Sequence, residues 1–180
     1  MKPIGFFIVA MSITACFALL VTLGVWELSY EFNCQQYLKR AADANTVELA
    51  TTNLDTAIKY LEAHELTNGV VSIFFHQPSN DIGFWYSNIR ACQEELSKVK
   101  PDTSAMEKSN LLMKLRETLL DNGESGTVVT HPSGISAYPY NALMFWLFTL
   151  NILLMFIGAF TIAYDYSHDV GTARLASYWK

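Results

Sequence analysis

Cysteine and histidine are the side chains of this chain best suited to covalent or metal chemistry, and it has three of the first and four of the second. Cys34 and Cys92 fall in the charged middle of the chain, each on the apolar stripe of a predicted helix. Inward-facing cysteines on two helices can come within the ~5.5 Å Cα separation that a disulfide favours. They can equally remain apart as small buried hydrophobes. A Cys34–Cys92 disulfide is therefore one hypothesis, and two separate thiols are the alternative.

Cys16 raises the different possibility of lipid attachment. The stretch Ile13-Thr14-Ala15-Cys16 is similar to a lipoprotein cleavage box, after which the new amino-terminal cysteine is lipidated. A lipidated protein would continue into a polar tether, whereas here the apolar run extends from Phe17 to Trp26. That length is typical of a membrane helix and exceeds the apolar region of a cleaved signal. We interpret the segment as an uncleaved anchor, with a cleaved signal as the alternative.

The histidines do not form a recognisable metal motif. His76 and His131 each close a β-like run, and a parallel pairing of these runs would bring them together, but two histidines alone do not make a zinc site. The sequence has no HExxH or CxxC motif, no Gly-rich phosphate loop and no dinucleotide fingerprint. We expect a non-catalytic protein without a metal or cofactor, although active sites also assemble from residues scattered in sequence.

The chain has two long blocks without a charged residue, residues 3–26 and 125–164, and we expect each to lie in an apolar environment. Each contains the roughly 20 apolar residues that a helix needs to cross the ~30 Å hydrocarbon core of a bilayer. We predict a transmembrane anchor in residues 1–26 and a second transmembrane helix in residues 141–164. A domain of residues 27–140 separates them, and a short tail of residues 165–180 follows.

The distribution of charged residues predicts how these segments are oriented across the membrane. Lys2 precedes the first helix, Arg174 and Lys180 follow the second, and residues 27–140 hold 9 basic against 15 acidic side chains. Because cytoplasmic flanks favour Lys and Arg, we expect both termini in the cytoplasm and an extracytoplasmic, or periplasmic, domain on a cell (inner) membrane. The net charge of −5 and the absence of a basic patch argue against a nucleic-acid partner.

Both predicted membrane helices carry small residues at a spacing of four, namely Ala10, Thr14 and Ala18 in the first and Ala159 and Ala163 in the second. Such strips allow another helix to approach closely. Asn151 lies in the middle of the second apolar segment. Since an amide in hydrocarbon needs a partner, we expect Asn151 to face protein.

The middle segment predicts an amphipathic helical bundle. Apolar residues recur at spacings of three and four in residues 47–61, 82–99 and 112–119, and an Asn-Thr-Val-Glu box at residues 45–48 and a Ser104/Glu107 box mark two helix starts. We expect the first of these helices to end near residues 68–69 and the last to end at residues 122–123. The anchor helix is expected to continue through Tyr30, Cys34, Tyr37 and Ala41. The short runs 70–76 and 127–131 are expected to pair as a minor two-stranded element.

Aromatic residues mark two further features. Phe84 and Tyr86 flank Trp85, a member of the apolar stripe, and therefore form either a docking surface or a cover over the strands. Five other rings are expected at the outer membrane boundary, where amphipathic rings concentrate: Trp26, Tyr30, Tyr138, Tyr140 and Trp146.

These patterns favour a non-catalytic membrane accessory or scaffold subunit that docks on other membrane subunits or on copies of itself. The alternative is a sensor or ligand-binding module, since a helix, an outer helical bundle and a second helix is also the plan of receptors for external ligands. A pore is less favoured, because neither apolar helix has a polar stripe beyond Asn151 and its threonines.

Overall fold

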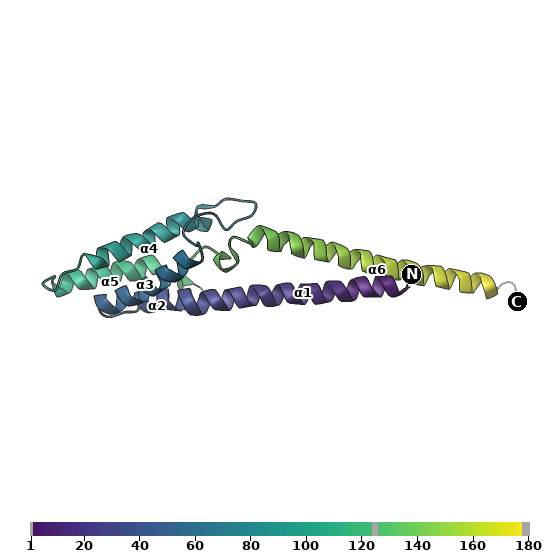
Figure 1. The fold of residues 1–180 in the computed structure, drawn as a ribbon, viewed down its shortest axis with the longest axis horizontal. Coiled ribbons are helices and arrows are strands. Elements are labelled where there is room, and N and C mark those ends of the chain that lie inside the picture. The colour runs from purple at the N-terminus through teal and green to yellow at the C-terminus, as the bar shows by residue number, and fades with distance from the viewer. Residues whose placement is uncertain (1, 124–125, 178–180) are drawn as a thin grey trace. The chain divides into compact units, whose positions relative to one another are not determined.

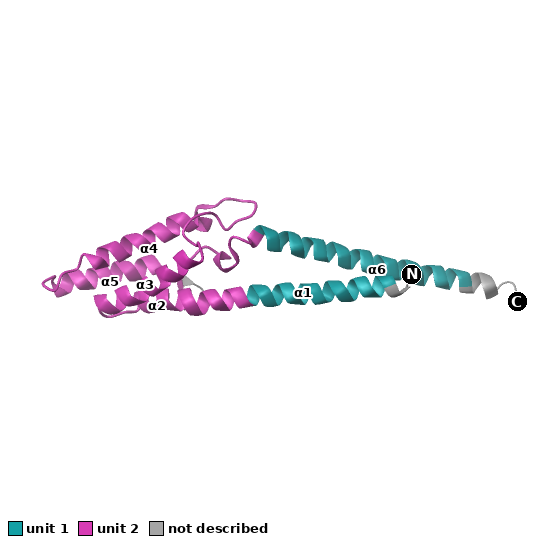
Figure 2. Cartoon of the chain, viewed as in Figure 1, with its two compact units in different colours: residues 1–24, 142–180 teal, residues 25–141 magenta. Residues whose placement is uncertain are grey.

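A computed structural model describes residues 2–123 and 126–177 of the chain and is mostly helical. It divides into two compact units, drawn in different colours in Figure 2. Unit 1 combines the two ends of the chain, residues 1–24 and 142–180, and unit 2 is residues 25–141. Figure 1 labels the helices used below.

Unit 1 consists of parts of two long apolar helices, α1 (Lys2–Tyr30) and α6 (Asn141–Ser177). Both are long and apolar enough to cross a membrane, with mean hydropathies of 2.5 and 2.2 in their most apolar parts. The prediction of two long apolar helices is therefore confirmed. Helix α1 continues to Tyr30, as expected for the anchor helix, whereas α6 extends beyond its predicted end, through the expected tail to Ser177. Lys180, used above for orientation, lies outside the described residues.

The predicted extension of α1 exists, but one wide turn interrupts it. A π-helical segment, η1 (Glu31–Gln35), leads into α2 (Gln36–Ala42). A π turn holds one residue more than an α turn, so the buried stripe continues from Cys34 to Leu38, and Tyr37 is only partly buried. Leu38 therefore takes the fully buried position, while Tyr37 packs against the core in part and Ala41 is buried as expected.

Helix α3 (Val47–Ala63) begins at Thr46, whose side chain accepts a hydrogen bond from the Leu49 amide. Its predicted apolar face is buried, but the helix ends five or six residues before the expected Asn68-Gly69 stop. The chain instead leaves the helix at Glu65, which has the left-handed φ of +57°. The Leu66 amide then donates to Leu61 O at 2.8 Å and closes the helix end.

Helices α4 (Ile82–Ser97) and α5 (Ala105–Leu119) complete the bundle. A single 3₁₀ turn, η2 (Pro78–Asn80), precedes α4, and Asp81 caps it by accepting from the Phe84 amide at 2.9 Å. Ser104 caps α5 as predicted, accepting from the Glu107 amide at 3.2 Å. The predicted stripe of α4 is buried over Ile82, Trp85, Ile89, Cys92 and Leu96.

The two-stranded element is a local hairpin: the predicted strand 127–131 is largely confirmed, whereas its predicted partner, 70–76, is wrong. β1 (Leu120–Gly123) pairs antiparallel with β2 (Gly126–Val129), with Leu120 opposite Val129. The run 70–76 contributes only an isolated bridge between Val70 and Asp81. Adjacent segments close a short loop at low entropic cost, whereas pairing the run 70–76 with 127–131 would close a loop of about 50 residues. The last bundle helix, expected to end at residues 122–123, therefore stops at Leu119, and strand β1 follows it directly.

The core of unit 2 lies between helix layers. Helix α2 packs on α3 and α5, α3 on α4, and α4 on α5. The largest fully buried side chains include Tyr30, Leu38, Leu54, Ile89 and Leu115. The 3₁₀ turn η3 (Ile135–Ala137) contributes Ile135 to the same core before the chain enters α6.

Candidate functional site

The two helices of unit 1 approach each other where both carry glycine. A Cβ atom on Gly5 would lie 2.6 Å from Thr161 Oγ1, and one on Gly158 would lie 2.8 Å from Val9 Cγ2. Any larger residue at either position would push the helices apart. Glycine therefore permits direct packing of α1 on α6 at this point.

Among the described side chains of this unit, two polar ones are buried, Ser12 and Asn151, with exposed fractions of 4% and 9%. Ser12 follows Gly5 by seven residues, and Gly158 follows Asn151 by seven. Each helix thus repeats a small or polar residue at heptad spacing on its buried face. This spacing of seven is the sequence signal that a search for spacings of four overlooks. Asn151 is enclosed by protein in the structure.

The predicted small-residue strips lie elsewhere. Ala10, Thr14 and Ala18 are exposed, as are Ala159 and Ala163. At about 100° per residue, Thr14 points about 200° away from Ser12 around the α1 axis. These five residues therefore do not make the contact between α1 and α6. The Thr14 hydroxyl donates to Ala10 O at 3.0 Å, so the strip on α1 presents no unbonded hydroxyl.

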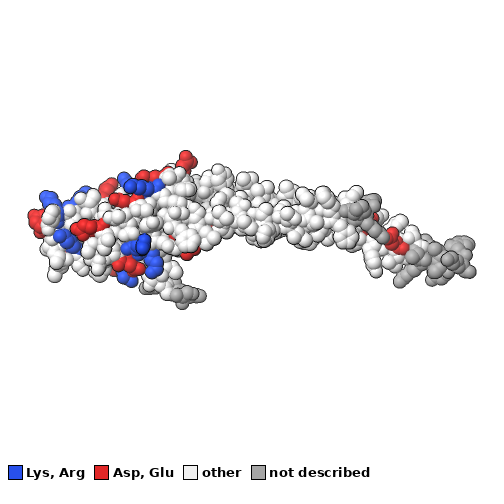
Figure 3. All heavy atoms as spheres, turned by 60° about the horizontal axis from the view of Figure 1, so that its bottom comes forward, with Lys and Arg blue, Asp and Glu red and all other residues white. Residues whose placement is uncertain are grey.

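The remaining surface of unit 1 is strongly apolar. Large side chains stand exposed on both helices, among them Phe6, Phe7, Phe17, Phe156 and Phe160, the last with 72% of its surface free. Only 11% of the most apolar part of each helix is buried. Charged side chains gather on unit 2 instead (Figure 3). Soluble monomers rarely expose apolar patches of more than a few hundred Å², so this surface requires a covering environment.

The two cysteines of unit 2 are free thiols in the structure, and the disulfide hypothesis is not realised there. Cys34 is fully buried in η1, which packs on α3, and the Tyr30 hydroxyl lies beside it. Cys92 instead faces α5, next to Leu111 and Leu115. Both cysteines point inward, but toward different helix contacts. Burial raises the pKa of the Cys34 thiol to about 12 and also raises that of Cys92, so neither is a ready nucleophile.

The two candidate histidines do not share a site. His76 is exposed in the loop before α4, whereas His131 packs edge-on against the Tyr30 ring with centroids 5.4 Å apart. They are separated because the run before His76 does not pair with the run before His131. Among the described residues, no group of three or more His, Cys, Asp or Glu side chains is placed to hold a metal ion.

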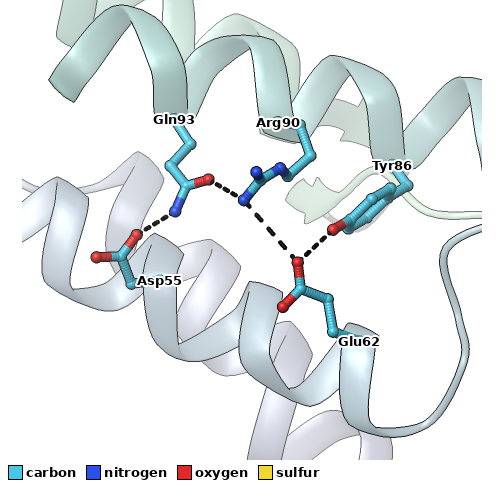
Figure 4. A network of polar contacts seen from close by, with 5 residues as sticks. All are labelled: Asp55, Glu62, Tyr86, Arg90 and Gln93. Atoms are coloured by element: carbon cyan, nitrogen blue, oxygen red, sulfur yellow. Dashed lines mark hydrogen bonds and ion pairs between the residues drawn. The ribbon is translucent and has the colours of Figure 1, made fainter. Parts of the chain in front are cut away.

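A polar network joins α3 to α4 (Figure 4). The Tyr86 hydroxyl donates to Glu62 Oε1 at 2.7 Å, and Arg90 Nη1 lies 3.9 Å from the same oxygen. Arg90 Nη1 also donates to Gln93 Oε1, and Gln93 donates to Asp55. Burial and the Glu62 carboxylate raise the pKa of Tyr86 to about 12. Of the predicted docking pair, Tyr86 is therefore held inside a helix contact, and only Phe84 is free, with 64% of its surface exposed.

Phe84 lines a cleft of about 360 Å³. The cleft lies between α4, η2 and the segment that follows β2, and its walls include Trp85, Pro78 and Pro132. The Trp85 indole donates to Thr130 O at 2.6 Å, which fixes one of the rings that line the cleft. Phe84 therefore lines a cleft beside the end of β2. We call this the α4 cleft.

The rings expected at a membrane boundary divide into two kinds. Tyr30 belongs to the core with 1% of its surface exposed, so its expected boundary position is wrong. Trp26 and Tyr140 stack with centroids 5.7 Å apart, and Tyr140 and Trp146 are more than half exposed. Tyr138 is partly buried. These four remain consistent with a boundary position.

Comparison with known proteins gives no family for this chain: no protein-family model matches it, and no curated protein or solved structure resembles it at a significant level.

Proposed function

We propose that this chain is a two-pass integral membrane protein without catalytic activity, which docks on other membrane subunits or on a second copy of itself. The observation that carries the proposal is the exposed apolar surface of unit 1. A lipid bilayer is the environment that covers such a surface at no cost, since all backbone groups of a helix are bonded internally.

Docking is supported by the side of α1 on which the small residues lie. The contact with α6 uses the Gly5 side, so Ala10, Thr14 and Ala18 are left free to admit another helix. Ala159 and Ala163 are likewise exposed on α6 and allow another helix to approach there. Both termini are proposed to be cytoplasmic and residues 27–140 extracytoplasmic, because Lys2 precedes the first apolar segment, Arg174 follows the second, and cytoplasmic flanks favour Lys and Arg.

The test is purification of the full chain from its native membrane in a mild detergent. The chain is expected to migrate with a stoichiometric partner or as an oligomer, well above its mass of 20.3 kDa. Ala18→Leu fills the strip and is expected to reduce co-migration about tenfold, a loss that corresponds to about 1.4 kcal/mol.

Ala15→Leu is the matched control. Ala15 is also exposed but lies about 100° from Thr14 around the helix, outside the strip. It is expected to co-migrate like the unchanged chain. A lone monomer in mild detergent, or equal behaviour of the two variants, would contradict docking through this strip.

The second candidate function is a ligand-binding module, and the α4 cleft is the observation that favours it. Its volume of about 360 Å³ falls within the range of small-molecule sites, and its walls are largely apolar with a few polar groups, such as Asn88 and Asp81. A thermal-shift screen of the detergent-solubilised chain should then find a small molecule that stabilises it. Asn88→Leu should abolish that stabilisation, and a screen without any stabilising compound would count against this candidate.

A further inference from the structure

A second cleft in unit 2, of about 410 Å³, lies among three segments. The end of α1 contributes Trp26 and Ser29, the end of α3 contributes residues 60 and 63–66, and residues 136 and 138–140 complete the wall. These segments are far apart in sequence. The cleft therefore exists only in the folded unit, and we call it the aromatic cleft.

Aromatic faces dominate this cleft. It contains four rings of the electron-rich kinds, Trp26, Tyr60, Tyr138 and Tyr140. Trp26 and Tyr140 are stacked at 5.7 Å with an interplanar angle of 29°, and Tyr60 stacks on His64 at 4.0 Å. Stacked rings hold each other in place, so their faces are ordered before anything binds. Ordered Trp and Tyr faces are the typical surroundings of an organic ammonium group.

The charge of the aromatic cleft has the sign that suits a cation. Glu65 lies in its wall, and the described residues that line it include no Lys or Arg. Glu65 is exposed and takes the left-handed φ of +57°, where glycine is the usual residue. A second carboxylate, Glu27, accepts a hydrogen bond from the lining residue Ser136 at 2.5 Å. Carboxylate and rings together would attract an ammonium ion and repel a simple anion.

The sequence places this cleft at the ends of both apolar segments. Trp26 is the last residue of the uncharged run 3–26, and Tyr140 directly precedes α6. If the proposed membrane insertion holds, on which this inference rests, both residues lie at the depth of the lipid headgroups. Headgroups that carry an ammonium ion next to a phosphate are then the cations present at the highest local concentration.

We propose that the aromatic cleft binds the ammonium headgroup of a zwitterionic phospholipid, against the rings of Trp26, Tyr60 and Tyr140 that line it and against the Glu65 carboxylate. Ser29 and Tyr138 also line the cleft, and in this proposal their hydroxyls are the hydrogen-bonding groups nearest the adjoining phosphate. Such a lipid would fasten unit 2 to the membrane surface.

Native mass spectrometry of the full chain tests this, using an equimolar mixture of phosphatidylcholine, phosphatidylethanolamine and phosphatidylglycerol. Retention of the two zwitterionic lipids over phosphatidylglycerol is expected on the order of tenfold, from several ring contacts and one carboxylate. Glu65→Gln and Tyr140→Leu should each reduce this preference. Glu48→Gln, an exposed glutamate of α3 outside the cleft, is the matched control and should retain it.

A second arm adds free choline or ethanolamine at millimolar concentration. The chain is expected to retain the lipid, because the acyl chains of the lipid contribute to binding and the free amine lacks them. Displacement by the free amine together with no lipid preference would assign the cleft to a soluble amine and overturn the lipid proposal. Equal retention of all three lipids, or an unchanged preference in Glu65→Gln, would also overturn it.

The failure of this inference is distinguishable from failure of the proposed function. Glu65→Gln should remain in carbonate-washed membranes and co-migrate with the same partner as the unchanged chain. A chain that stays in the membrane but shows no lipid preference refutes only the headgroup site. A chain that carbonate removes from the membrane refutes the proposed function itself.

Discussion

Burial decides the chemistry of Cys34 more than its residue type does. The thiol has none of its surface exposed, and its pKa is raised to about 12 from an ordinary value of 9.0, chiefly by loss of hydration. Only the thiolate form reacts with electrophiles. Two cysteines on apolar stripes are therefore as consistent with two buried, unreactive thiols as with a disulfide.

Alkylation of Cys34 by iodoacetamide at pH 8 is expected to be at least about a hundredfold slower in the folded chain than in denaturant, because the thiolate is scarce and enclosed. Peptide mass spectrometry measures the rate. Cys92, which is less deeply buried and whose pKa is also raised, serves as the internal comparison. Recovery of a peptide pair joined through Cys34 and Cys92 would contradict the structure.

Tyr86 gives a pH-dependent contribution to stability. Its pKa is raised to about 12 in the folded chain, first by burial and then by the bond to Glu62, against about 10 in an unfolded chain. A raised pKa means that the contribution is complete below pH 10 and disappears as the pH rises through 12.

Tyr86→Phe should therefore lower the free energy of unfolding by about 0.5–1 kcal/mol at neutral pH, the net value of one hydrogen bond. The difference between the two chains should vanish near pH 12. Chemical denaturation at a series of pH values measures it. A difference that stays constant from pH 8 to pH 12 would show that the Glu62 bond is not its source.

At the level of elements, the π turn η1 acts as a one-residue insertion. Tyr30, Cys34 and Leu38 are buried at spacings of four, which a helix with one wide turn keeps on a single face. Deletion of the exposed residue Asn33 should close the turn to regular α-helix and leave the flanking residues facing the core.

Deletion of Asn33 is thus expected to be tolerated far better than deletion of Asn53 in α3. The two residues are well matched, since each donates its side-chain amide to the carbonyl four residues earlier at 2.8 Å. Loss of Asn53 rotates half of α3 by about 100° and removes its apolar face from the core. Far-UV circular dichroism and thermal unfolding compare the deletions; equal losses would contradict the insertion model.

The features of this fold that depend on local periodicity could be predicted from the sequence. The α4 stripe was predictable because burial within one helix follows the 3.6-residue repeat alone, and the Ser104 cap because it depends on four consecutive residues. The π turn was not, since an added residue shifts the repeat without changing composition. Strand β1 was predicted as the end of the last bundle helix, because the first helix-ending signal after Leu119 is Asn122-Gly123.

The candidate sites were harder to predict from the sequence, because they depend on which helices pack against each other. The aromatic cleft draws on three distant segments, and the face of α1 that meets α6 is set by Gly5 and Ser12 and not by the more conspicuous spacing of Ala10 and Thr14. Two cysteines on separate stripes give no information on which stripes touch. Such facts follow from the packing of whole helices and not from any short window.

For the whole molecule, the proposed topology makes residues 27–140 accessible from outside the cell and the end of α6 accessible only from inside. A membrane-impermeant maleimide tests this on variants in which the native cysteines are replaced. Glu107→Cys should react in intact cells, and Thr172→Cys only after permeabilisation; both native residues are exposed. The reverse pattern would place the termini outside.

The central claim is that the outward strip of α1 meets another protein within the membrane. Its most direct measurement is photocrosslinking in intact membranes, with a photoreactive side chain at Thr14 and, as control, at Leu20, which is exposed but lies about 120° from Thr14 around the α1 axis. The account predicts one discrete protein adduct from position 14, either a distinct subunit or a second copy, and lipid adducts alone from position 20. Lipid adducts alone at both positions would contradict it.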